Sequence, residues 1–460
     1  MTAPSSYLNP KSEESKYWNP YIETMPREKL DEFHLRRLRS LLHHAYSNSK
    51  FYRRRFDEAG IKPEDIKTLE DFKRKVPLTD KSDFIQLQEE QPPYGQTGAV
   101  GEGLLSHHCE TSGTTGIPLR IPYTMYDTER YGESWVYGWW GIGIRPSDSF
   151  YFAFNWGLFA GFWSAYWGAR RLGAKVYSGG GQTTEGHIRQ ILRLKPTVLL
   201  STPTYALHVA EVAKGMGIDL VSSSVKYTYH AGEPGPHAIP AMRKQLDEAW
   251  GAISSELYGV AELDALGPGC PTREGIHMNE SNTFSWSRDP ITGEEVPEGA
   301  IGENIVTTYV NNAQPLINYR THDLVERHLS CECGRTWAFL RGVVLGRSDF
   351  MVTVRGTNVY QSAVENVIGG VSGVSSHYEL VLTRESGLDK MNVRFEPVPD
   401  YPQDKYGELA SQVEKAIKDA LGVRLAPEIV PVGSLPRYEL KTKRIIDQRP
   451  TDIRRQLDRQ

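Results

Sequence analysis

The stretch that decides the fold is Thr111-Ser112-Gly113-Thr114-Thr115-Gly116-Ile117-Pro118. Its glycines permit tight backbone turns that point amide hydrogens at an anion, and its hydroxyl side chains add donors to phosphate oxygens. The stretch therefore predicts a loop that holds a polyphosphate. It is not a P-loop, because the Gly-Lys-[Ser/Thr] ending is missing, and on composition alone it would also fit an ordinary surface loop.

Further motifs follow this loop in a fixed order. They are Ala231-Gly232-Glu233-Pro234, Tyr258-Gly259-Val260-Ala261-Glu262, Tyr319-Arg320-Thr321-His322-Asp323-Leu324, Gly346-Arg347-Ser348-Asp349 and Leu435-Pro436-Arg437-Tyr438-Glu439-Leu440-Lys441-Thr442-Lys443-Arg444. Together with the loop they resemble the ordered motifs of the adenylate-forming acyl-ligase superfamily, and most closely those of phenylacetate-CoA ligases. The likeness runs from about Tyr17 to the C-terminus and includes Tyr52 and residues 155–161 and 201–205.

The composition limits the classes of function. The chain has 460 residues, of which 39% are hydrophobic and 24% charged, and its formal net charge is −4. This fits a globular protein of about two or three domains, and the lack of a basic excess predicts no nucleic-acid partner. The polar N-terminus does not resemble a secretory signal, and no run approaches about 20 apolar residues, so we expect a cytoplasmic protein with no membrane partner. The oligomeric state stays open, with a homodimer as one option.

Hydrophobic periodicity predicts two domains. In the first, residues 1–346, the part up to residue 100 is mainly helical, with an amphipathic helix from Leu30 to Tyr46. Short apolar runs then alternate with helical stretches, which predicts an α/β fold of sheets wrapped by helices, with antiparallel structure near residues 301–309. The second, residues 347–460, predicts a small α+β domain. Its strands are expected at 350–354, 377–383, 392–395 and 429–431, and its helices at 360–369 and 405–421.

The resemblance implies where the nucleotide binds. Residues 111–116 would cradle the ATP phosphates, and residues 232–234 would border the adenine. Tyr258, followed by Gly259, would stack on the base, because an aromatic face is a good platform for a purine. Asp323 would accept hydrogen bonds from the ribose hydroxyls. Out of this context each charged residue would be interpreted as part of a surface ion pair.

The resemblance also implies a catalytic set. Glu262 would hold Mg²⁺, a hard cation that prefers carboxylate and phosphate oxygens, and Arg347 would pair with the ribose or α-phosphate side. A carboxylate attacks the α-phosphate and pyrophosphate leaves, so the protein must neutralise charge on both. Lys441 matches the family's lysine for this task, with Lys443 as the alternative. Asp349 matches the hinge about which the family's mobile C-terminal domain pivots.

The implied activity is ATP-dependent activation of an aromatic carboxylic acid to an acyl-adenylate, followed by transfer to coenzyme A. Four residues depart from the family's usual pattern. They are Ala261 in place of Ser or Thr, His322 and Leu440 in place of glycine, and Phe350 in place of aspartate. Two alternatives therefore stay open. One is an amide-forming ligase that uses an amine acceptor, and the other is a catalytically weakened nucleotide-binding protein.

Aromatic residues crowd the region between Tyr131 and Trp167, and most of them are expected to be core. The likeness places a subset near the acid, namely Phe154, Asn155, Trp156 and Phe159. An apolar aromatic cleft with one polar group suits a flat aryl acid. Because Asn155-Trp156 replaces the aromatic-glycine pair common in phenylacetate enzymes, the acid need not be phenylacetate.

Three cysteines and one histidine form a candidate metal site. Cys270 and His277 are followed by Cys331 and Cys333, and three thiolates with one imidazole are the ligand set of a closed structural zinc site. Some relatives in the phenylacetate-CoA ligase branch carry a cysteine-rich metal site in this region. The alternative is a set of unliganded buried cysteines in a reducing compartment.

Overall fold

The structure is a computed structural model that describes residues 14–111, 117–348, 351–354, 357–385, 388–436 and 444–449. The chain forms two compact units, and each is described by itself. The first contains Met1–Thr321 and Val325–Val344, and the second contains His322–Leu324 and Leu345–Gln460. Their interpretation as an ATP- and acid-binding domain and a mobile domain stays a prediction.

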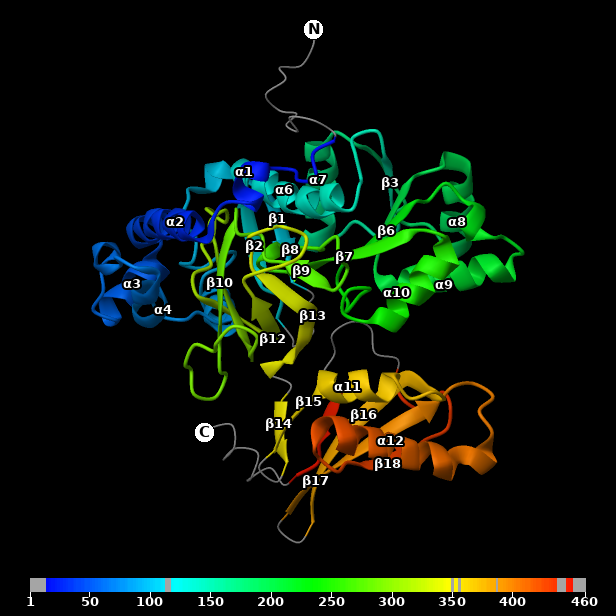
Figure 1. Cartoon of the computed structure of the whole chain (residues 1–460). Helices are drawn as coiled ribbons and strands as arrows, with labels where there is room; N and C mark the ends of the chain where they lie inside the picture. Colours follow the sequence, from blue (N-terminus) through cyan, green and yellow to red (C-terminus); the bar gives the residue numbers. More distant parts are fainter. Residues whose placement is uncertain are drawn as a thin grey trace. The chain divides into compact units, whose positions relative to one another are not determined.

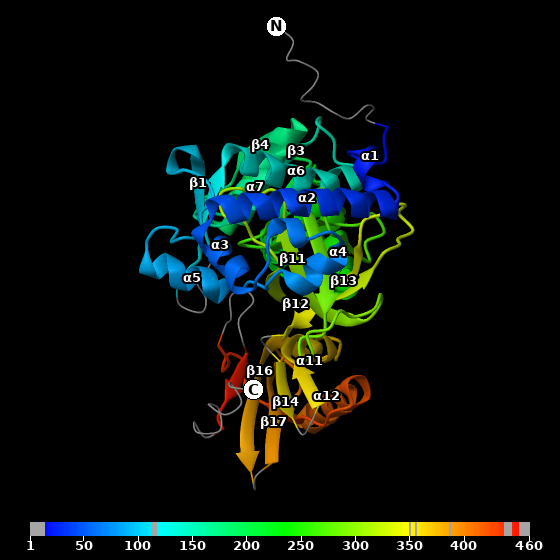
Figure 2. The same cartoon turned by 90° about the vertical axis from the view of Figure 1, so that its left-hand side faces the viewer.

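The first unit begins with helices, as the sequence predicts. They are α1 (Pro20–Glu23), α2 (Arg27–Asn48), α3 (Lys50–Glu58), α4 (Leu69–Lys75) and α5 (Lys81–Glu90). The amphipathic stretch from Leu30 to Tyr46 lies within α2, the long helix that faces the viewer in Figure 2. Thr68 and Asp80 cap α4 and α5 in capping boxes with Asp71 and Asp83, which fixes where these helices begin.

A six-stranded sheet forms one half of the first unit, in the order β4-β3-β5-β6-β7-β8. The strands are β3 (Ser149–Phe152), β4 (Lys175–Ser178), β5 (Val198–Ser201), β6 (Tyr227–His230), β7 (Ile253–Val260) and β8 (Asp264–Pro268). All neighbouring pairs are parallel except β7 with β8. The helices are α6 (Met125–Gly141), α7 (Ala160–Leu172), α8 (Thr184–Leu194), α9 (Pro203–Gly215) and α10 (Pro240–Trp250). The predicted parallel sheet wrapped by helices is confirmed.

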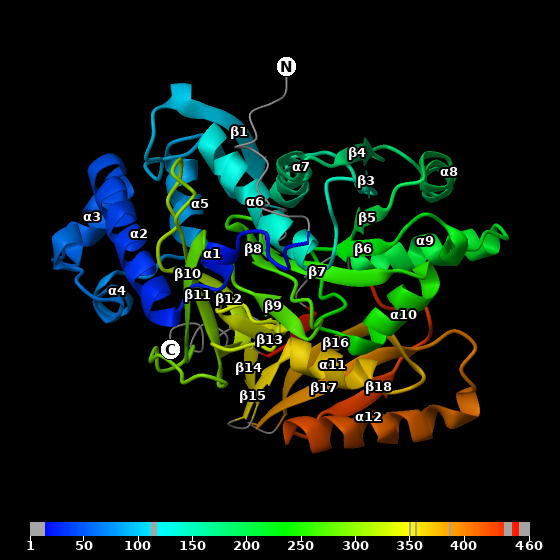
Figure 3. The ribbon, with the colours of Figure 1, turned by 45° about the horizontal axis from the view of Figure 1, so that its top comes forward.

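Helices cover both faces of this sheet because alternate side chains of each strand point to opposite sides. Phe150 and Phe152 of β3 pack in one apolar cluster with Trp139 of α6. Tyr151, between them, packs in a second cluster with Trp250 of α10. Figure 3 shows α7 on one side of these strands and α8 and α9 on the other. The loops after the parallel strands meet at one edge, where ligands bind in open α/β sheets.

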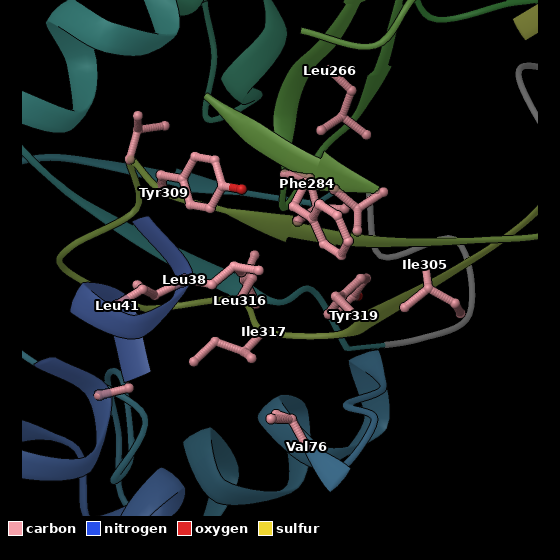
Figure 4. Packing of buried hydrophobic residues seen from close by; sticks show 14 of the residues in the cluster. Leu38, Leu41, Val76, Leu266, Phe284, Ile305, Tyr309, Leu316, Ile317 and Tyr319 are labelled. Atoms are coloured by element: carbon pink, nitrogen blue, oxygen red, sulfur yellow. The ribbon is translucent and has the colours of Figure 1, made fainter. Parts of the chain in front are cut away.

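An antiparallel sheet forms the other half of the first unit, in the order β10-β11-β12-β13-β9. Its strands are β9 (Gly275–His277), β10 (Thr283–Arg288), β11 (Ile301–Thr308), β12 (Tyr319–His328) and β13 (Phe339–Arg347). The hairpin of β1 (Leu105–Glu110) and β2 (Arg120–Thr124) stands beside the 111–118 loop. Figure 4 shows Leu38 and Leu41 of α2 in the same buried cluster as Ile305, Leu316 and Tyr319.

The second unit is an α+β sandwich around its own core (Figure 1). Its elements are β14 (Met351–Val354), β15 (Thr357–Tyr360), α11 (Gln361–Gly369), β16 (Val374–Glu385), β17 (Leu388–Pro397), α12 (Tyr406–Leu421), β18 (Ala426–Ile429) and β19 (Ile445–Asp447). The prediction of a strand at 429–431 is wrong, because β18 ends at Ile429, where its parallel pairing with Phe395 of β17 ends. Pro431 could not continue the ladder as a donor. The sequence analysis missed β15 and β19.

Short 3₁₀ turns connect some of these elements, at Pro63–Asp65, Glu102–Leu104, Leu220–Ser222 and Gln403–Lys405. Among the described residues no helix is both long and apolar enough to cross a membrane.

Candidate functional site

Thr111 closes the base of the 111–118 loop. Its backbone N–H donates to the Leu119 carbonyl at 3.0 Å, and its Oγ1 accepts from the Leu119 N–H at 3.0 Å. This reciprocal pair extends the hairpin of β1 and β2 by one step and fixes where the loop leaves the strands. Ser112, Gly113, Thr114, Thr115 and Gly116 lie outside the described residues, so their predicted contacts with ATP stay predictions.

The loop after β6 carries the next predicted nucleotide contacts. Gly232 has φ +91°, a left-handed conformation that favours glycine. Glu233 accepts hydrogen bonds from Thr204 Oγ1 at 2.6 Å and from the Thr204 N–H at 3.3 Å. A carboxylate at the N-terminus of α9 is favoured by the helix dipole. These contacts tie the loop after β6, which also holds Pro234, to the first turn of α9, the helix that follows β5.

The end of β7 and the turn that follows it carry the Tyr258 motif. The Tyr258 ring is 4% exposed within the main apolar cluster, and Asn304 Nδ2 donates to its Oη at 3.5 Å. At Gly259 an added Cβ would stand 3.0 Å from the Asp264 carbonyl oxygen, so the two strands approach closely here. Ala261 is exposed at the turn and Glu262 is buried.

Glu262 is held by two residues that the sequence analysis did not assign. Tyr319 Oη donates to Glu262 Oε1 at 2.6 Å, and Lys81 Nζ lies 3.9 Å from the same oxygen. Tyr319 belongs to one of the motifs quoted above. The role of Lys81 could not be predicted from the sequence, because a lone lysine at the start of a helix is common. With Oε1 oriented in this way, the carboxylate retains a second oxygen of the kind that Mg²⁺ prefers. Glu262 therefore fits the predicted magnesium role.

Asp323 and Arg347 lie together in the second unit. Arg347 Nη1 stands 3.1 Å from Asp323 Oδ1, and the Asp323 side chain is 1% exposed. His322 beside them has φ +60° and pairs through Nδ1 with Ser348 Oγ at 3.3 Å. This left-handed conformation explains why glycine is usual at this position, since a side chain there costs about 1 kcal/mol. Thus two groups predicted at the ribose are partners of one another.

The aromatic residues predicted to line the acid pocket differ in their surroundings: two pack against other rings and one is exposed. Phe154 stacks on Phe162 with ring centroids 3.9 Å apart, and Trp156 lies 4.8 Å from Trp163. Phe159 stands at the start of α7 and is 47% exposed. Asn155 Oδ1 accepts from the Gly181 N–H at 2.8 Å, so its carbonyl group holds the loop after β4.

The structure brings the four predicted metal ligands together. The donor atoms of Cys270, His277, Cys331 and Cys333 all lie within 4.8 Å of one another. Cys270 Sγ and Cys331 Sγ are 3.6 Å apart, and His277 Nε2 lies 3.1 Å from Cys333 Sγ. Cys270 follows β8, His277 ends β9, and both other cysteines lie in the loop between β12 and β13.

The surroundings of this cluster fit a zinc ion. His277 Nδ1 donates to the Trp337 carbonyl at 3.1 Å, which leaves the Nε2 lone pair for a metal. Two thiolates on one tetrahedral zinc with bonds of about 2.3 Å stand about 3.8 Å apart, close to the 3.6 Å observed. A disulfide would need about 2.05 Å. Gly334 has φ +85°, and a Cβ there would also stand 2.6 Å from Tyr17 Oη, so the ligand loop favours glycine at this position.

Several predicted residues lie outside the described part of the chain. They are the hinge residue Asp349, the departure Phe350 and, in the C-terminal motif, Leu440, Lys441 and Lys443. Their roles stay predictions.

Comparison with known proteins defines the class and then the family. Residues 356–449 match the AMP-binding enzyme C-terminal domain, which marks the chain as an adenylate-forming enzyme. It is 34% identical to a phenylacetate-coenzyme A ligase of Thermus thermophilus over 94% of this chain and 99% of that protein. It is 32% identical to the Escherichia coli enzyme of the same name over 93% of this chain and 97% of that protein.

Solved structures agree with this assignment. A 2-hydroxyisobutyryl-CoA ligase in complex with its acyl-adenylate matches with a TM-score of 0.86 and 30% identity, over 100% of this chain and 97% of that chain. The chain therefore belongs to the phenylacetate-coenzyme A ligase family and is an AMP-forming acid-CoA ligase. This confirms the family that the motifs predict.

Proposed function

We propose that the enzyme converts an aromatic carboxylic acid, ATP and CoA into an aryl-CoA thioester, AMP and pyrophosphate, with Mg²⁺ as the metal and in the cytoplasm, where ATP and CoA are available. The observation that carries the proposal is the full-length likeness to phenylacetate-coenzyme A ligases. The aromatic cluster of Phe154, Trp156, Phe162 and Trp163 beside the ligand-binding edge supports an aromatic acid.

The reaction has two steps. A carboxylate oxygen of the acid bonds to the α-phosphorus of ATP as the bond to pyrophosphate breaks. The CoA thiol then loses its proton, its sulfur bonds to the acyl carbon, and AMP leaves with one oxygen of the original carboxylate. Because charge builds on phosphate oxygens in the first step, positioned cations and hydrogen-bond donors supply most of the catalysis.

We assign roles within this scheme as follows. Thr111 positions the phosphate-binding loop, Glu233 and Tyr258 flank the adenine, and Asp323 with Arg347 binds the ribose. Glu262, oriented by Tyr319, holds Mg²⁺. In the second unit Lys441 neutralises charge at the α-phosphate during the first step, and the domain that begins near residue 347 pivots at Asp349 between the steps. The resemblance supports these last two assignments.

A hydroxy acid is the second candidate substrate. Solved structures of a 2-hydroxyisobutyryl-CoA ligase hold a 2-hydroxyisobutyryl adenylate, and two of them also hold CoA. These matches cover the whole of this chain, so a small branched hydroxy acid should be included among the acids tested as substrates. The aromatic side chains around Trp156 favour the ring-bearing acid over it.

We also propose a structural zinc ion at Cys270, His277, Cys331 and Cys333. The convergence of four donors and the hydrogen bond that orients His277 support it. A metal there would join the loop after β8 to the loop before β13. In addition, Tyr17 Oη donates to the Cys333 carbonyl at 3.0 Å, so the N-terminal segment is joined to the same loop.

The test is a pyrophosphate-release screen across aryl acids, straight-chain acids and 2-hydroxyisobutyrate, with and without CoA. We expect aryl acids to give the highest kcat/KM. We also expect one CoA to be consumed for each AMP that is formed. Glu262→Gln should lower the rate by about 10² or more. Glu294→Gln, at an exposed carboxylate, serves as the matched control. A fatty acid or 2-hydroxyisobutyrate that outperforms every aryl acid would contradict the proposal.

A further inference from the structure

Four buried polar atoms in the first unit lie close together and make no hydrogen bond of good geometry to a described residue, although the Thr308 hydroxyl approaches the Tyr131 phenol closely enough to lower its pKa. They are Asp264 Oδ2, Tyr123 Oη, Tyr131 Oη and Thr308 Oγ1. Each side chain is nearly inaccessible, with Asp264 3% exposed, Tyr123 and Thr308 0% and Tyr131 1%. They come from four different elements, β8, β2, α6 and β11. Buried polar groups in folded proteins are almost always paired, so such a group indicates a missing partner.

These side chains lie close enough to influence one another. The rings of Tyr123 and Tyr131 are 5.6 Å apart in an edge-to-face arrangement. Burial raises the pKa of both phenols well above the ordinary value, and the negative charge of Asp264 raises the pKa of each further. Burial also raises the pKa of Asp264 to about 7, although hydrogen bonds from Ser164 and the Ala265 backbone oppose this.

The backbone at Asp264 is itself unusual. Its φ is +57°, in the left-handed region that most side chains avoid and that aspartate tolerates. Val260 pairs with Asp264 across the turn that carries Glu262. Residues held in such sparsely populated backbone regions cluster at functional sites. One oxygen of this carboxyl, Oδ2, has no hydrogen-bond partner among the described residues.

This polar cluster is joined to α7, the helix that begins directly after Phe159 of the candidate acid pocket. Ala160, next to Phe159, packs in the same buried cluster as Tyr123, Tyr131 and Leu263. Ser164 lies in α7, five residues beyond Phe159 and about 7.5 Å further along the helix axis. Asp264 itself is two residues beyond Glu262, the proposed magnesium ligand. Asp264 is therefore joined both to the turn that carries Glu262 and, through the Ser164 hydroxyl, to α7, which begins directly after Phe159.

We propose that Asp264, together with Tyr123 and Tyr131, binds a hydrogen-bond donor at the far end of the substrate acid, a ring hydroxyl or amino group, and so determines which acid the enzyme selects. The proposal rests on the proposed function and names its substrate class. The carboxylate accepts from the donor, and the phenols can donate to or accept from the same substituent. Asp264 takes no part in the bonds that form or break.

The test compares acids that differ only in the donor. Acid-dependent ATP–pyrophosphate exchange is measured for phenylacetate and benzoate and for their ring-hydroxy and ring-amino derivatives. We expect the wild-type enzyme to favour a donor-bearing acid by about 10² or more in kcat/KM, because a site built for a hydrogen bond rejects the analogue that lacks it. The hydroxy and amino series then show which donor the site prefers.

The variants separate a specificity role from a structural one. Asp264→Ala should reduce the preference by about 10- to 100-fold, and Tyr131→Phe by a few-fold, with little loss on the unsubstituted acid. Asp264→Asn keeps the shape and tolerates the left-handed backbone, so it carries the test if Asp264→Ala does not fold. Ser287→Ala, at a buried hydroxyl of β10 that has no partner among the described residues, should leave the preference unchanged.

The outcomes distinguish two kinds of failure. If aryl acids support exchange but donor-bearing and unsubstituted acids are used equally by the wild type and by Asp264→Asn, the specificity role is wrong and the proposed function stands. If no aryl acid supports exchange, both are wrong. A preference for donor-bearing acids that falls in Asp264→Asn and Tyr131→Phe, and not in Ser287→Ala, establishes the role.

Discussion

Two buried carboxylates in the first unit have opposite surroundings. Glu280 accepts from Arg27 Nη1 at 2.9 Å, from His34 Nε2 at 3.2 Å and from the Ala338 N–H at 2.8 Å. Asp264 is as deeply buried, yet its Oδ2 has no hydrogen-bond partner among the described residues. The first carboxylate joins α2 to the antiparallel sheet. The second accepts hydrogen bonds from Ser164 and the Ala265 backbone, and we assign its remaining oxygen, Oδ2, to the substrate.

The pKa values of the two carboxyl groups reflect these surroundings: that of Glu280 is lowered and that of Asp264 is raised. Burial raises the pKa of Glu280, but Arg27 and His34 outweigh burial and hold that pKa well below its usual range. No such cation stands among the causes that act on Asp264, so burial dominates and raises its pKa to about 7. Burial therefore does not fix the behaviour of a carboxylate, whereas the charges around it do.

The largest effect is expected at Glu280. Glu280→Ala removes the partner of a half-buried guanidinium and a buried histidine, so the free energy of unfolding should fall by about 3 kcal/mol. Urea denaturation of the whole enzyme measures it. Glu294→Ala, at an exposed carboxylate, should change it by less than about 0.5 kcal/mol. Equal small losses in both variants would show that Glu280 is not a structural anchor.

The pH dependence of stability should separate the two carboxylates by sign. The raised pKa of Asp264 means that between about pH 4 and pH 7 the folded protein binds more protons there than the unfolded chain. Its contribution to stability is therefore present at low pH and lost as the pH rises, at up to about 1.4 kcal/mol per unit and about 4 kcal/mol in all. The lowered pKa of Glu280 gives stability above its unfolded pKa of about 4.3, which is lost as the pH falls.

Thermal unfolding from pH 4 to pH 8 measures this difference. Asp264→Asn removes only the pH-dependent contribution of Asp264. The stability of the variant relative to the wild type should therefore increase as the pH rises toward 7. A difference curve that is flat, or that slopes the other way, would show that burial does not raise the pKa of Asp264 in solution.

The cysteine cluster provides a third buried polar set, in which a metal would be the partner. We predict about one zinc per chain in protein made without metal supplementation, measured by elemental analysis. Removing the metal should lower the free energy of unfolding by about 3 kcal/mol, because binding to the folded state alone is coupled to folding. Cys331→Ser should have a similar effect, with Cys109→Ser, outside the cluster, as the control. Metal far below stoichiometric would contradict the assignment.

The smallest effect compares two buried tyrosines. Tyr309 Oη bonds His34 Nδ1 at 2.7 Å, whereas Tyr131 Oη makes no hydrogen bond of good geometry and is only approached by the Thr308 hydroxyl. Tyr309→Phe should therefore lower the free energy of unfolding by about 1 to 2 kcal/mol, and Tyr131→Phe should leave it unchanged or raise it. Chemical denaturation checks both. Equal losses would mean that Tyr131 is paired in solution and would weaken the case for a substrate donor.

Local pattern predicts much of this molecule. The period of apolar residues gives α2, and the alternation of short apolar runs with helical stretches gives the parallel sheet. The strand at β18 could not be placed by pattern, because its register depends on β17. The motifs identify the family, and the spacing of Cys270 and His277 from Cys331 and Cys333 suggests the metal cluster that the fold then assembles.

Pattern does not reveal what buried polar residues meet. His34 and Glu280 are 246 residues apart, and only the packing of α2 on the sheet brings them together. Asp264 looks like any strand-end aspartate in the sequence. The lack of a partner at its Oδ2 follows from the convergence of four separate elements, and Lys81 beside Glu262 is equally invisible to a local pattern.

The measurement that tests the central claim most directly follows an isotope. An aryl acid labelled with ¹⁸O in its carboxylate is incubated with the enzyme, ATP, Mg²⁺ and CoA, and the products are analysed by mass spectrometry. The account predicts aryl-CoA and AMP in equal amounts, with one labelled oxygen transferred to AMP. AMP without label, ADP as the nucleotide product, or turnover confined to non-aromatic acids would contradict it.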